Sequence, residues 1–593
     1  MKNRPMTPEL LARRIDCVLG RRPCELRLTN LRMLDVMNGR IIENAEIFVD
    51  NGVIIDAGSQ CRARSQQVLD LKGGLAVPGL IDAHVHIESS MLTPVRFARL
   101  VAPFGTTTVI ADPHEIANVL GIDGIRFMLE EARKAEIDMF FMLSSCVPST
   151  SFETAGAELK ARDLQALLAE DRVLGLAEMM NVPGVLAKDP ELLAKAAMAL
   201  SEGMRIDGHS PLVKGAALSA CAACGISSDH ESSTPAELVD RLRRGVTVFM
   251  REGSAGKNVA ALARAATSSN SRFLCLCTDD ASPDDVFVGG HINHVVRRAV
   301  ECGIDFVEAL RMATINTAQH YGLRGKGVLA PGFDADIAVI SDTESMTVSA
   351  CLAAGRLIAR DGGMLSPEPD DPVADRVRSS VRIRPVSEGD LRIATESGRA
   401  RVIGLVPGNL ITEHLVLDVQ TAPDGAIDCG DNPGLVKLAV VERHHASGRI
   451  GLGLVKGLVE EGMAFDGAIA STVAHDSHNI VAAGDNDADM VRAIEEIDRM
   501  QGGLVLVRKG KVAARLRLEV AGLMSNVDAR TTALAKRRFI EAAHSLFHVP
   551  EHLHPVMALS FLSLAVIPHL RVTDRGLFDV DAFAMTNLDP QLS

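Results

Sequence analysis

Two histidines one residue apart, His84 and His86, follow an apolar run that begins at Gly74. Side chains of a strand repeat their direction every second residue, so these two imidazoles project from the same face. Two imidazoles on one face can hold one metal ion. Alone, the pair is a weak signal, because histidines are also common structural residues. The histidine pair makes the chain a candidate metalloenzyme.

More residues that could bind metal or transfer protons follow later apolar runs. Each stands where a strand-like segment ends, and the set comprises Asp112, His114, Glu115, Glu178, His209, His230 and Asp279. Taken singly, a histidine is often a satisfied core residue, and Glu178 or Asp279 is as readily a helix cap as a ligand. Their joint placement at successive strand ends favours a single site.

The elements that must position these residues alternate regularly. Strand-like runs and helix-like stretches follow one another through eight cycles, and the helix-like stretches include residues 190–202, 235–244 and 259–268. Eight parallel strands with crossover helices close into a barrel, and active sites of such barrels lie at the carboxyl ends of the strands. The sequence therefore predicts an α/β fold in which the candidate residues meet at one mouth of a TIM-like (β/α)8 barrel.

The chain is longer than a barrel requires. Its 593 residues are 47% hydrophobic and 23% charged, which is typical of a globular protein with two or three domains. Short strands with Asn-Gly turns precede the barrel, and a similar pattern follows it. We expect a composite small β domain (24–75 plus 326–365), the barrel (76–325), an acidic, proline-rich linker (366–372) and a C-terminal α+β domain (380–593).

The composition of the chain limits the kinds of partner that we expect it to bind. A formal net charge of −14 argues against binding to the phosphate backbone of nucleic acids. The longest apolar stretch, residues 556–568, is shorter than the roughly 20 residues of a membrane-spanning helix, so it predicts core and no membrane partner. The 11 scattered cysteines and the lack of a secretion signal favour the cytoplasm. A small-molecule substrate and a homodimeric assembly are expected.

Two sets of motifs carry a resemblance to known families. One set resembles the amidohydrolase superfamily and consists of the segment 78–86, the strand-end residues Glu178, His209, His230 and Asp279, and the Ala-Pro-Gly-Phe-Asp-Ala-Asp segment 330–336. The other resembles the bacterial adenine deaminases and consists of Ile-Glu-Ser-Ser-Met (87–91), Asp-Pro-His-Glu-Ile (112–116), Ala-Glu-Met-Met-Asn (177–181), Asp-Gly-His (207–209), Cys-Thr-Asp-Asp (277–280) and Ala-His-Asp-Ser-His-Asn (474–479). The resemblance covers nearly the whole chain.

This resemblance implies hydrolysis of adenine to hypoxanthine and ammonia by a metal-bridged hydroxide. A metal supplies hydroxide at neutral pH because it lowers the pKa of bound water to about 7. Two divalent cations are implied, Mn2+ or Fe2+, although mixed nitrogen and oxygen ligands also suit Zn2+. Glu178 would bridge the two ions, and the full set of ligands would be His84, His86, Glu178, His209, His230 and Asp279.

Asp279 is the expected catalytic base, since a carboxylate at a strand end beside the metals can pass a proton from water to the leaving ammonia. Glu178 is catalytic through its bridging position. His114 and Glu115 are candidates to position or protonate the purine. The alternative is that they belong to a loop that leads into a helix with Pro113 early in it.

Ser89 and Ser90 follow the histidine pair closely, so they are candidates for substrate contact. They could equally cap the helix expected near Thr93. The cluster at 475–479 also has two interpretations. It could reach the barrel mouth as part of a lid or hold a further ion, or it could be a polar turn that satisfies its own backbone.

Two other functions stay open at this stage. One is a hydrolase of the same barrel that acts on a cyclic amide or another aminated heterocycle, because loops set substrate choice in this architecture. The other is a non-catalytic metal-binding protein whose C-terminal domain is the working part. The presence of all six candidate ligands disfavours the second.

Overall fold

The histidine pair lies on strand β6 (Leu80–His86) of a computed structural model that describes residues 6–370, 372–407 and 409–592. Every residue of β6 is buried, as expected for a parallel strand that is covered on both faces. Seven further strand positions follow it: β7 (Thr106–Ala111), β8 (Asp138–Leu143), β9 (Val173–Met179), β10 (Arg205–Gly208), β11 (Ser228–Asp229), β12 (Thr247–Arg251), and β13 (Leu274–Cys277) continued by β14 (Asp279–Asp280).

These strands form a closed ring. Neighbours from β6 to β10 pair in parallel, as do β11 to β13. A bridge between Ile206 and Ile226 joins the two groups, and β14 returns to pair with β6. The last strand is broken at Thr278, whose backbone N–H donates to the Asp82 carboxylate at 3.1 Å. The ring confirms the predicted (β/α)8 barrel.

Helices connect the strands, and several of them begin at a side-chain cap. Asp189 caps α6 (Pro190–Ser201), and Thr234 forms a capping box with Glu237 at the start of α8 (Pro235–Arg243). The stretch predicted at 259–268 is shorter, with α9 (Val259–Leu262) followed by a 3-10 turn. Further helices around the barrel are α2 (Pro94–Val101), α3 (His114–Lys134), α7 (Gly215–Ala223), α10 (Pro283–Gly289), α11 (Ile292–Glu301), α12 (Phe306–Met312) and α13 (Ile315–His320).

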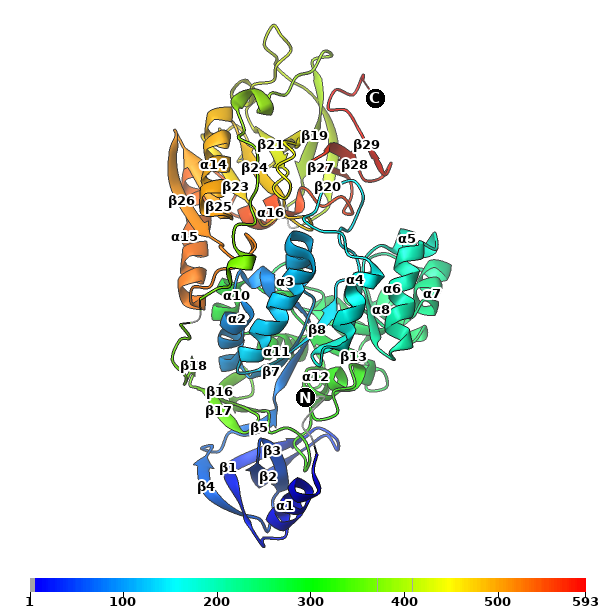
Figure 1. Cartoon of the computed structure of the whole chain (residues 1–593), viewed down its shortest axis with the longest axis vertical. Coiled ribbons are helices and arrows are strands. Elements are labelled where there is room, and N and C mark those ends of the chain that lie inside the picture. Colours follow the sequence, from blue (N-terminus) through cyan, green and yellow to red (C-terminus); the bar gives the residue numbers. More distant parts are fainter. Residues whose placement is uncertain (1–5, 371, 408, 593) are drawn as a thin grey trace.

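A nine-stranded sheet lies at one end of the barrel (Figure 1). It joins two distant parts of the chain, because β5 of the first part pairs with β15 of the second. Asn51 and Gly52 both have positive φ, as their hairpin turn requires. Helix α1 (Pro8–Val18) precedes the sheet, whose strands are β1 (Pro23–Asp35), β2 (Arg40–Asp50), β3 (Val53–Gly58), β4 (Arg64–Asp70), β5 (Leu75–Pro78), β15 (Ile337–Asp342), β16 (Thr347–Ala353), β17 (Arg356–Arg360) and β18 (Gly363–Met364).

The predicted linker is anchored to the barrel. Arg99 on α2 donates to the hydroxyl of Ser366 at 2.7 Å and to a carboxylate oxygen of Glu368 at 3.1 Å. Arg96 on the same helix donates to the Pro369 carbonyl at 2.8 Å. Asp371 lies outside the described residues. The segment therefore runs along the barrel surface to the last part of the chain.

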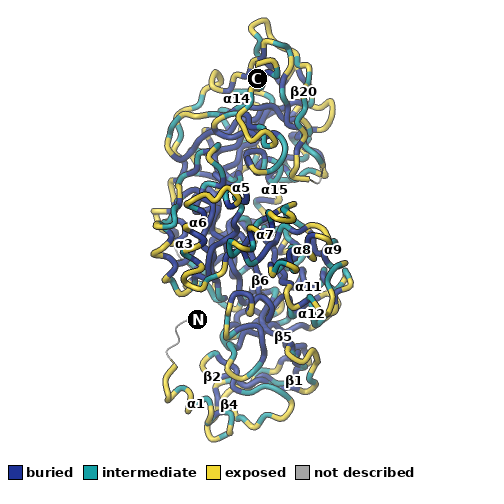
Figure 2. The backbone as a smooth tube through the Cα atoms, turned by 90° about the vertical axis from the view of Figure 1, so that its right-hand side faces the viewer, coloured by how far each residue is buried: buried dark blue, intermediate teal, exposed yellow. Residues whose placement is uncertain are grey.

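The C-terminal part lies at the opposite end of the barrel from the nine-stranded sheet (Figure 1). It mixes helices with an eight-stranded sheet, as predicted. Each of the three parts of the molecule has buried residues in its interior (Figure 2). Its main elements are β19 (Arg399–Leu405), β20 (Thr412–Asp418), β21 (Leu435–Val441), β22 (Ile450–Lys456), β23 (Ala468–Ser471), β24 (Ile480–Gly484), α14 (Asp487–Met500), β25 (Gly503–Arg508), β26 (Lys511–Arg517), α15 (Ala529–Phe547), α16 (Pro555–Phe561), and the small sheet β27 (Leu570–Thr573), β28 (Gly576–Asp579) and β29 (Ala584–Met585).

Across the described part of the chain, no helix combines the length and the apolar character needed to cross a membrane. Residues 556–561 of the longest apolar stretch lie in α16, in which Val556 and Leu559 are buried in the C-terminal core. The exact boundaries between the three parts stay predictions.

Candidate active site

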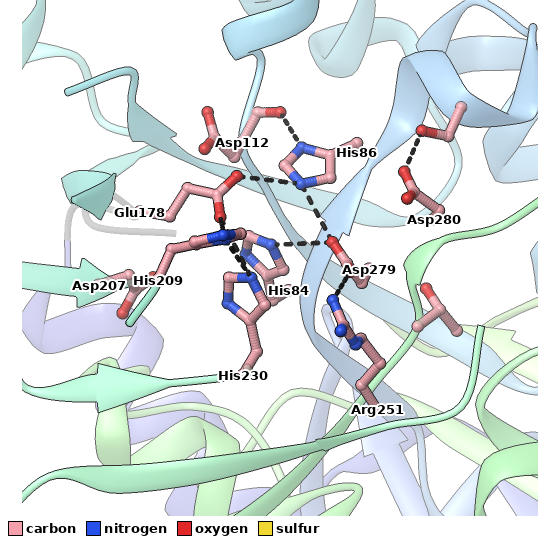
Figure 3. A network of polar contacts seen from close by, with 12 residues as sticks. His84, His86, Asp112, Glu178, Asp207, His209, His230, Arg251, Asp279 and Asp280 are labelled. Atoms are coloured by element: carbon pink, nitrogen blue, oxygen red, sulfur yellow. Dashed lines mark hydrogen bonds and ion pairs between the residues drawn. The ribbon is translucent and has the colours of Figure 1, made fainter. Parts of the chain in front are cut away.

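The six predicted ligands meet at one mouth of the barrel (Figure 3). His84 and His86 end β6, and Glu178 is the sixth residue of β9. His209 and His230 directly follow β10 and β11, and Asp279 begins β14. Because all strands of the ring are parallel, their carboxyl ends bring together residues that are up to 195 positions apart in sequence.

Glu178 lies at the centre of this group, with its two carboxylate oxygens directed to different histidines. Oε1 is 3.3 Å from Nε2 of His86. Oε2 is 2.7 Å from Nδ1 of His209 and 3.1 Å from Nε2 of His230. A carboxylate placed in this way can reach two ions at once.

Asp279 faces the histidine pair. Its Oδ1 is 3.1 Å from Nε2 of His86 and 3.4 Å from Nε2 of His84. Its backbone is left-handed, with φ of 63°, which a non-glycine residue adopts only when the surroundings hold it there. The break in the eighth strand at Thr278 thus directs the Asp279 carboxylate into the barrel mouth.

The donor set fits divalent cations. His86 Nδ1 donates to the Asp112 carbonyl at 3.1 Å, so in the neutral ring Nε2 carries the lone pair and faces the site. The buried Nε2 of His84 has no hydrogen-bond partner, which is costly for a polar atom unless something else occupies the site. Ligand atoms of His84, His86 and Asp279 lie within 4.8 Å of one another, as do those of His84, Glu178 and His230.

Charges within the site support metal binding. Burial alone would raise the pKa of Glu178, but His209 beside it holds that pKa well below its usual value. Burial likewise opposes ionisation of Asp279, but Arg251 and the surrounding histidines together outweigh it and hold the pKa of Asp279 well below its usual value. Both carboxylates are therefore ionised. Burial lowers the pKa of His209, whereas Glu231 and Glu178 raise it to about 9, so cation binding must displace a proton there.

Arg251, which the sequence analysis did not select, is part of this site. It ends β12 and contacts the second oxygen of Asp279, and it also donates to Oε1 of Glu231 at 2.6 Å. Its position after an apolar run, Val246 to Met250, is the same signal that identified the other residues. Arginine does not ligate metals, so a search for metal ligands does not point to it.

Neither Glu178 nor Asp279 caps a helix, so the helix-cap alternative is wrong for both. The helix after β9, α5 (Val182–Leu186), is capped by Asn181, and the N-cap residue of α10 is Ser282. Both carboxylates instead face the histidines. The joint placement of the six residues, which the sequence predicted, is what the barrel produces.

The two serines after the histidine pair have different environments. Ser89 donates to the Asp280 carboxylate and lines a pocket beside the ligands. Ser90 is fully buried, and its hydroxyl donates to the Ile87 carbonyl at 2.6 Å. The side chain of Ser90 is thus engaged by its own turn, and only Ser89 remains a candidate for substrate contact. Neither serine caps α2, whose N-cap residue is Thr93.

Glu88 is a second residue of the site to which the sequence pattern assigned no role. It is buried, one oxygen accepts from the Ile116 N–H at 3.2 Å, and the other has no hydrogen-bond partner. Burial raises the pKa of Glu88 to about 7. Its side chain lines the same pocket as Ser89.

His114 and Glu115 also lie at the barrel mouth, where they begin α3. His114 Nδ1 is 3.4 Å from Glu178 Oε1, and its Nε2 is 3.3 Å from Glu115 Oε1. Glu115 lines the pocket and contacts His475 and His478 of the C-terminal part. Both residues therefore lie at the start of a helix and also face the site. The two interpretations of this segment, a helix start and a place in the site, hold together.

The pocket beside the ligands has two walls of different origin. The barrel supplies Glu88, Ser89, Glu115, Ser254, Asp280 and Ser282. The C-terminal part supplies the apolar wall and three histidines, among them Val473, His475, His478, His554, Val556 and Phe561. The His475 ring stacks on Phe561 with centroids 4.5 Å apart. The cluster at 475–479 thus reaches the barrel mouth rather than forming an isolated turn.

Comparison with known proteins agrees with this arrangement. The amidohydrolase family profile matches residues 75–358, and the adenine deaminase C-terminal domain profile matches residues 409–584. Adenine deaminase of Nitratidesulfovibrio vulgaris is 46% identical over 590 residues, covering 99% of this chain and all of its own. The adenine deaminases of Clostridium acetobutylicum (42%) and Brucella suis (41%) each match 96% of this chain, which covers 98% and 95% of them. The chain therefore belongs to the adenine deaminases of the amidohydrolase family.

Proposed function

We propose that this protein hydrolyses adenine to hypoxanthine and ammonia. The observation that carries the proposal is the similarity to adenine deaminases over the whole chain, including the C-terminal domain that forms one wall of the pocket. The polar side chains at the barrel mouth are of the types that this hydrolysis needs. The protein is on this basis a hydrolase of a cyclic amidine C–N bond.

We propose that two divalent cations bind at the barrel mouth. His84 and His86 would hold one, His209 and His230 the other, and Glu178 would bridge them, with Asp279 as a further ligand. A divalent cation supplies hydroxide at neutral pH because it lowers the pKa of a bound water to about 7. Mn2+ or Fe2+ is the proposed native metal, with Zn2+ compatible with the same donors.

Asp279 is the proposed catalytic base. In the overall reaction a C6–O bond forms, the C6–N bond breaks, and the two protons of water end on ring N1 and on the leaving ammonia. Asp279 is ionised and faces the metal ligands, so it can take a proton from water and deliver it to the amino nitrogen. Arg251, which contacts its other oxygen, fixes the orientation of the carboxylate.

His114, Glu115 and Ser89 are proposed to position the purine. His114 lies between Glu178 and Glu115, and both Glu115 and Ser89 line the pocket. These groups offer donors and acceptors to the edge of a flat heterocycle, and the apolar wall from the C-terminal part covers its face.

The test is to strip the purified protein with a chelator, reload it with Mn2+, Fe2+ or Zn2+, and measure ammonia release from adenine, adenosine, guanine, cytosine and a cyclic amide. We expect release from adenine only, lost on chelation and restored by metal. Activity on another of these compounds would keep the site but overturn the substrate. Bound metal without any hydrolysis would favour a non-catalytic protein.

The homodimeric assembly and the cytoplasmic location stay predictions. Light scattering on the purified protein measures the first, and fractionation of the native cells measures the second. The native metal is identified by elemental analysis of protein purified without added metal, where two equivalents per chain are expected.

A further inference from the structure

The loop between β23 and β24 carries two histidines of the C-terminal part into the barrel mouth. His475 Nδ1 is 2.7 Å from Glu115 Oε1, and His478 Nε2 contacts Glu115 Oε2. Glu115 is 2% exposed and His478 is 1% exposed. Each oxygen of a fully buried carboxylate therefore faces one histidine from a different part of the chain.

The proton on His478 is placed by the backbone. The N–H of Ala474 donates to His478 Nδ1 at 3.1 Å, so Nδ1 carries a lone pair and the ring proton of the neutral imidazole is on Nε2. Burial lowers the pKa of His478 to about 4, which keeps the ring neutral at physiological pH. His478 Nε2–H therefore donates to Glu115.

This tautomer decides between two interpretations of the cluster. Ligand atoms of Glu115, His475 and His478 lie within 4.8 Å of one another, which is close enough for a third cation. A ring nitrogen that carries a proton has no lone pair for a metal, so His478 Nε2 is not a ligand while Ala474 holds Nδ1. The cluster is instead a pair of hydrogen-bond donors around a carboxylate.

Glu115 in turn is joined to the metal site. Its Oε1 is 3.3 Å from His114 Nε2, and His114 Nδ1 is 3.4 Å from Oε1 of Glu178, the central carboxylate. Two side chains thus separate His478 from Glu178. Glu115 also lines the pocket, so its orientation sets the position of a charge beside the substrate.

We infer that His478 is a positioning residue of the deamination reaction, which holds Glu115 in one orientation from the C-terminal part of the chain. The inference rests on the proposed adenine deaminase function and deepens it. The C-terminal part contributes to turnover through Glu115 as well as to the wall of the pocket.

Two substitutions separate this role from a structural one. In His478→Gln the side-chain amide lies near the position of Nε2 and can still donate to Glu115. In His478→Asn it lies near Nδ1 and cannot reach Glu115. We expect His478→Asn to lower kcat by about 10- to 100-fold, the range for groups that orient a catalytic residue, and His478→Gln to restore most of it. KM for adenine should change far less than kcat in both variants.

A double-mutant cycle with Glu115→Gln gives the decisive measurement. If His478 acts through Glu115, then adding His478→Asn to Glu115→Gln should lower kcat by less than about 2-fold relative to Glu115→Gln alone. His445→Phe is the matched control, because His445 crosses the same interface to the Ala155 carbonyl at 3.1 Å without touching Glu115. This control should keep the wild-type kcat. Thermal unfolding and metal content are measured for every variant.

Multiplicative losses in the cycle, or equal losses for the Gln and Asn variants, would overturn the inference while the proposed function stands. A third equivalent of metal that disappears in His478→Asn would overturn it in favour of a third cation site. Wild-type protein without adenine deaminase activity would overturn the proposed function and this inference together.

Discussion

At the scale of the residue, the centre of this protein is one carboxylate between two sets of histidines. Glu178 directs one oxygen to His86 and the other to His209 and His230. Neutral glutamine has the same shape but only one acceptor oxygen and no charge. The bridging role that we propose depends on both oxygens, so the change from Glu to Gln isolates it.

For Glu178→Gln we expect metal content to fall from two equivalents to one or fewer. We expect kcat to fall by at least about 10^3-fold, as for loss of a central catalytic group. Elemental analysis and an ammonia assay measure the two quantities. Exposed Glu344→Gln serves as the control and should behave as wild type. Wild-type metal content in Glu178→Gln would contradict the bridging role.

Asp279→Asn tests the proposed base separately. The amide keeps one oxygen that can face the histidines but cannot accept a proton in the working pH range. We expect near-normal adenine KM and a loss in kcat of at least about 10^3-fold, measured by steady-state kinetics in saturating metal. A variant that keeps the wild-type rate would remove Asp279 from the mechanism.

At the scale of the element, the position of the histidine pair depends on close packing at the start of β6. A Cβ built on Gly79 would lie 2.1 Å from Oγ1 of Thr107 on β7, and Thr107 is fully buried. Any side chain there must push β6 away from β7. Since β6 carries His84 and His86, such a shift would also move these two candidate ligands.

Gly79→Ala should therefore lower the free energy of unfolding by about 1–3 kcal/mol, the usual cost of overpacking. Urea denaturation followed by circular dichroism measures this value. The control is Gly389→Ala, because a Cβ on Gly389 meets only Ser387 at an ordinary 3.7 Å. Equal stability of the two variants would show that β6 and β7 separate freely.

At the scale of the whole molecule, the C-terminal part is held over the barrel mouth by buried polar contacts. Ser477 donates to Glu153 at 2.7 Å, and the Thr154 N–H donates to Asp574 at 2.8 Å. Glu153 is 4% exposed. Burial, together with the nearby Asp476, raises the pKa of Glu153 from 4.5 to about 7, so the folded protein favours its neutral form.

This raised pKa predicts a pH dependence of stability. Between about pH 4.5 and 7 the folded state binds more protons at Glu153 than the unfolded state. The contribution of Glu153 to the free energy of unfolding is therefore complete below pH 4.5 and is lost as pH rises through 7. The total loss is about 3 kcal/mol. Glu153→Gln removes this titration.

Unfolding of wild type and Glu153→Gln, compared from pH 5 to pH 8, should show wild type losing stability relative to the variant as pH rises. Exposed Glu158→Gln in the same loop is the control and should follow wild type. Parallel curves for wild type and Glu153→Gln would contradict the raised pKa.

Local pattern was enough to predict the barrel and the meeting of the six candidate ligands at its mouth, for a physical reason. Residues such as His84, Glu178 and Asp279 follow apolar runs, and parallel strands in a closed ring must bring their carboxyl ends together. Once the runs are recognised, the meeting of distant residues follows from the topology. The composite sheet from both sides of the barrel was predictable in the same way, from its turns and strands.

Tertiary packing decided what lies around those ligands. The contact of His478 with Glu115 joins residues 363 positions apart across two parts of the chain, and no periodicity within either part implies it. Within the barrel, the contact of Arg251 with Asp279 likewise depends on side-chain packing, beside the point where the last strand is broken at Thr278. Strand direction follows from local sequence, whereas the docking of one folded part on another depends on the shapes and charges of complete surfaces.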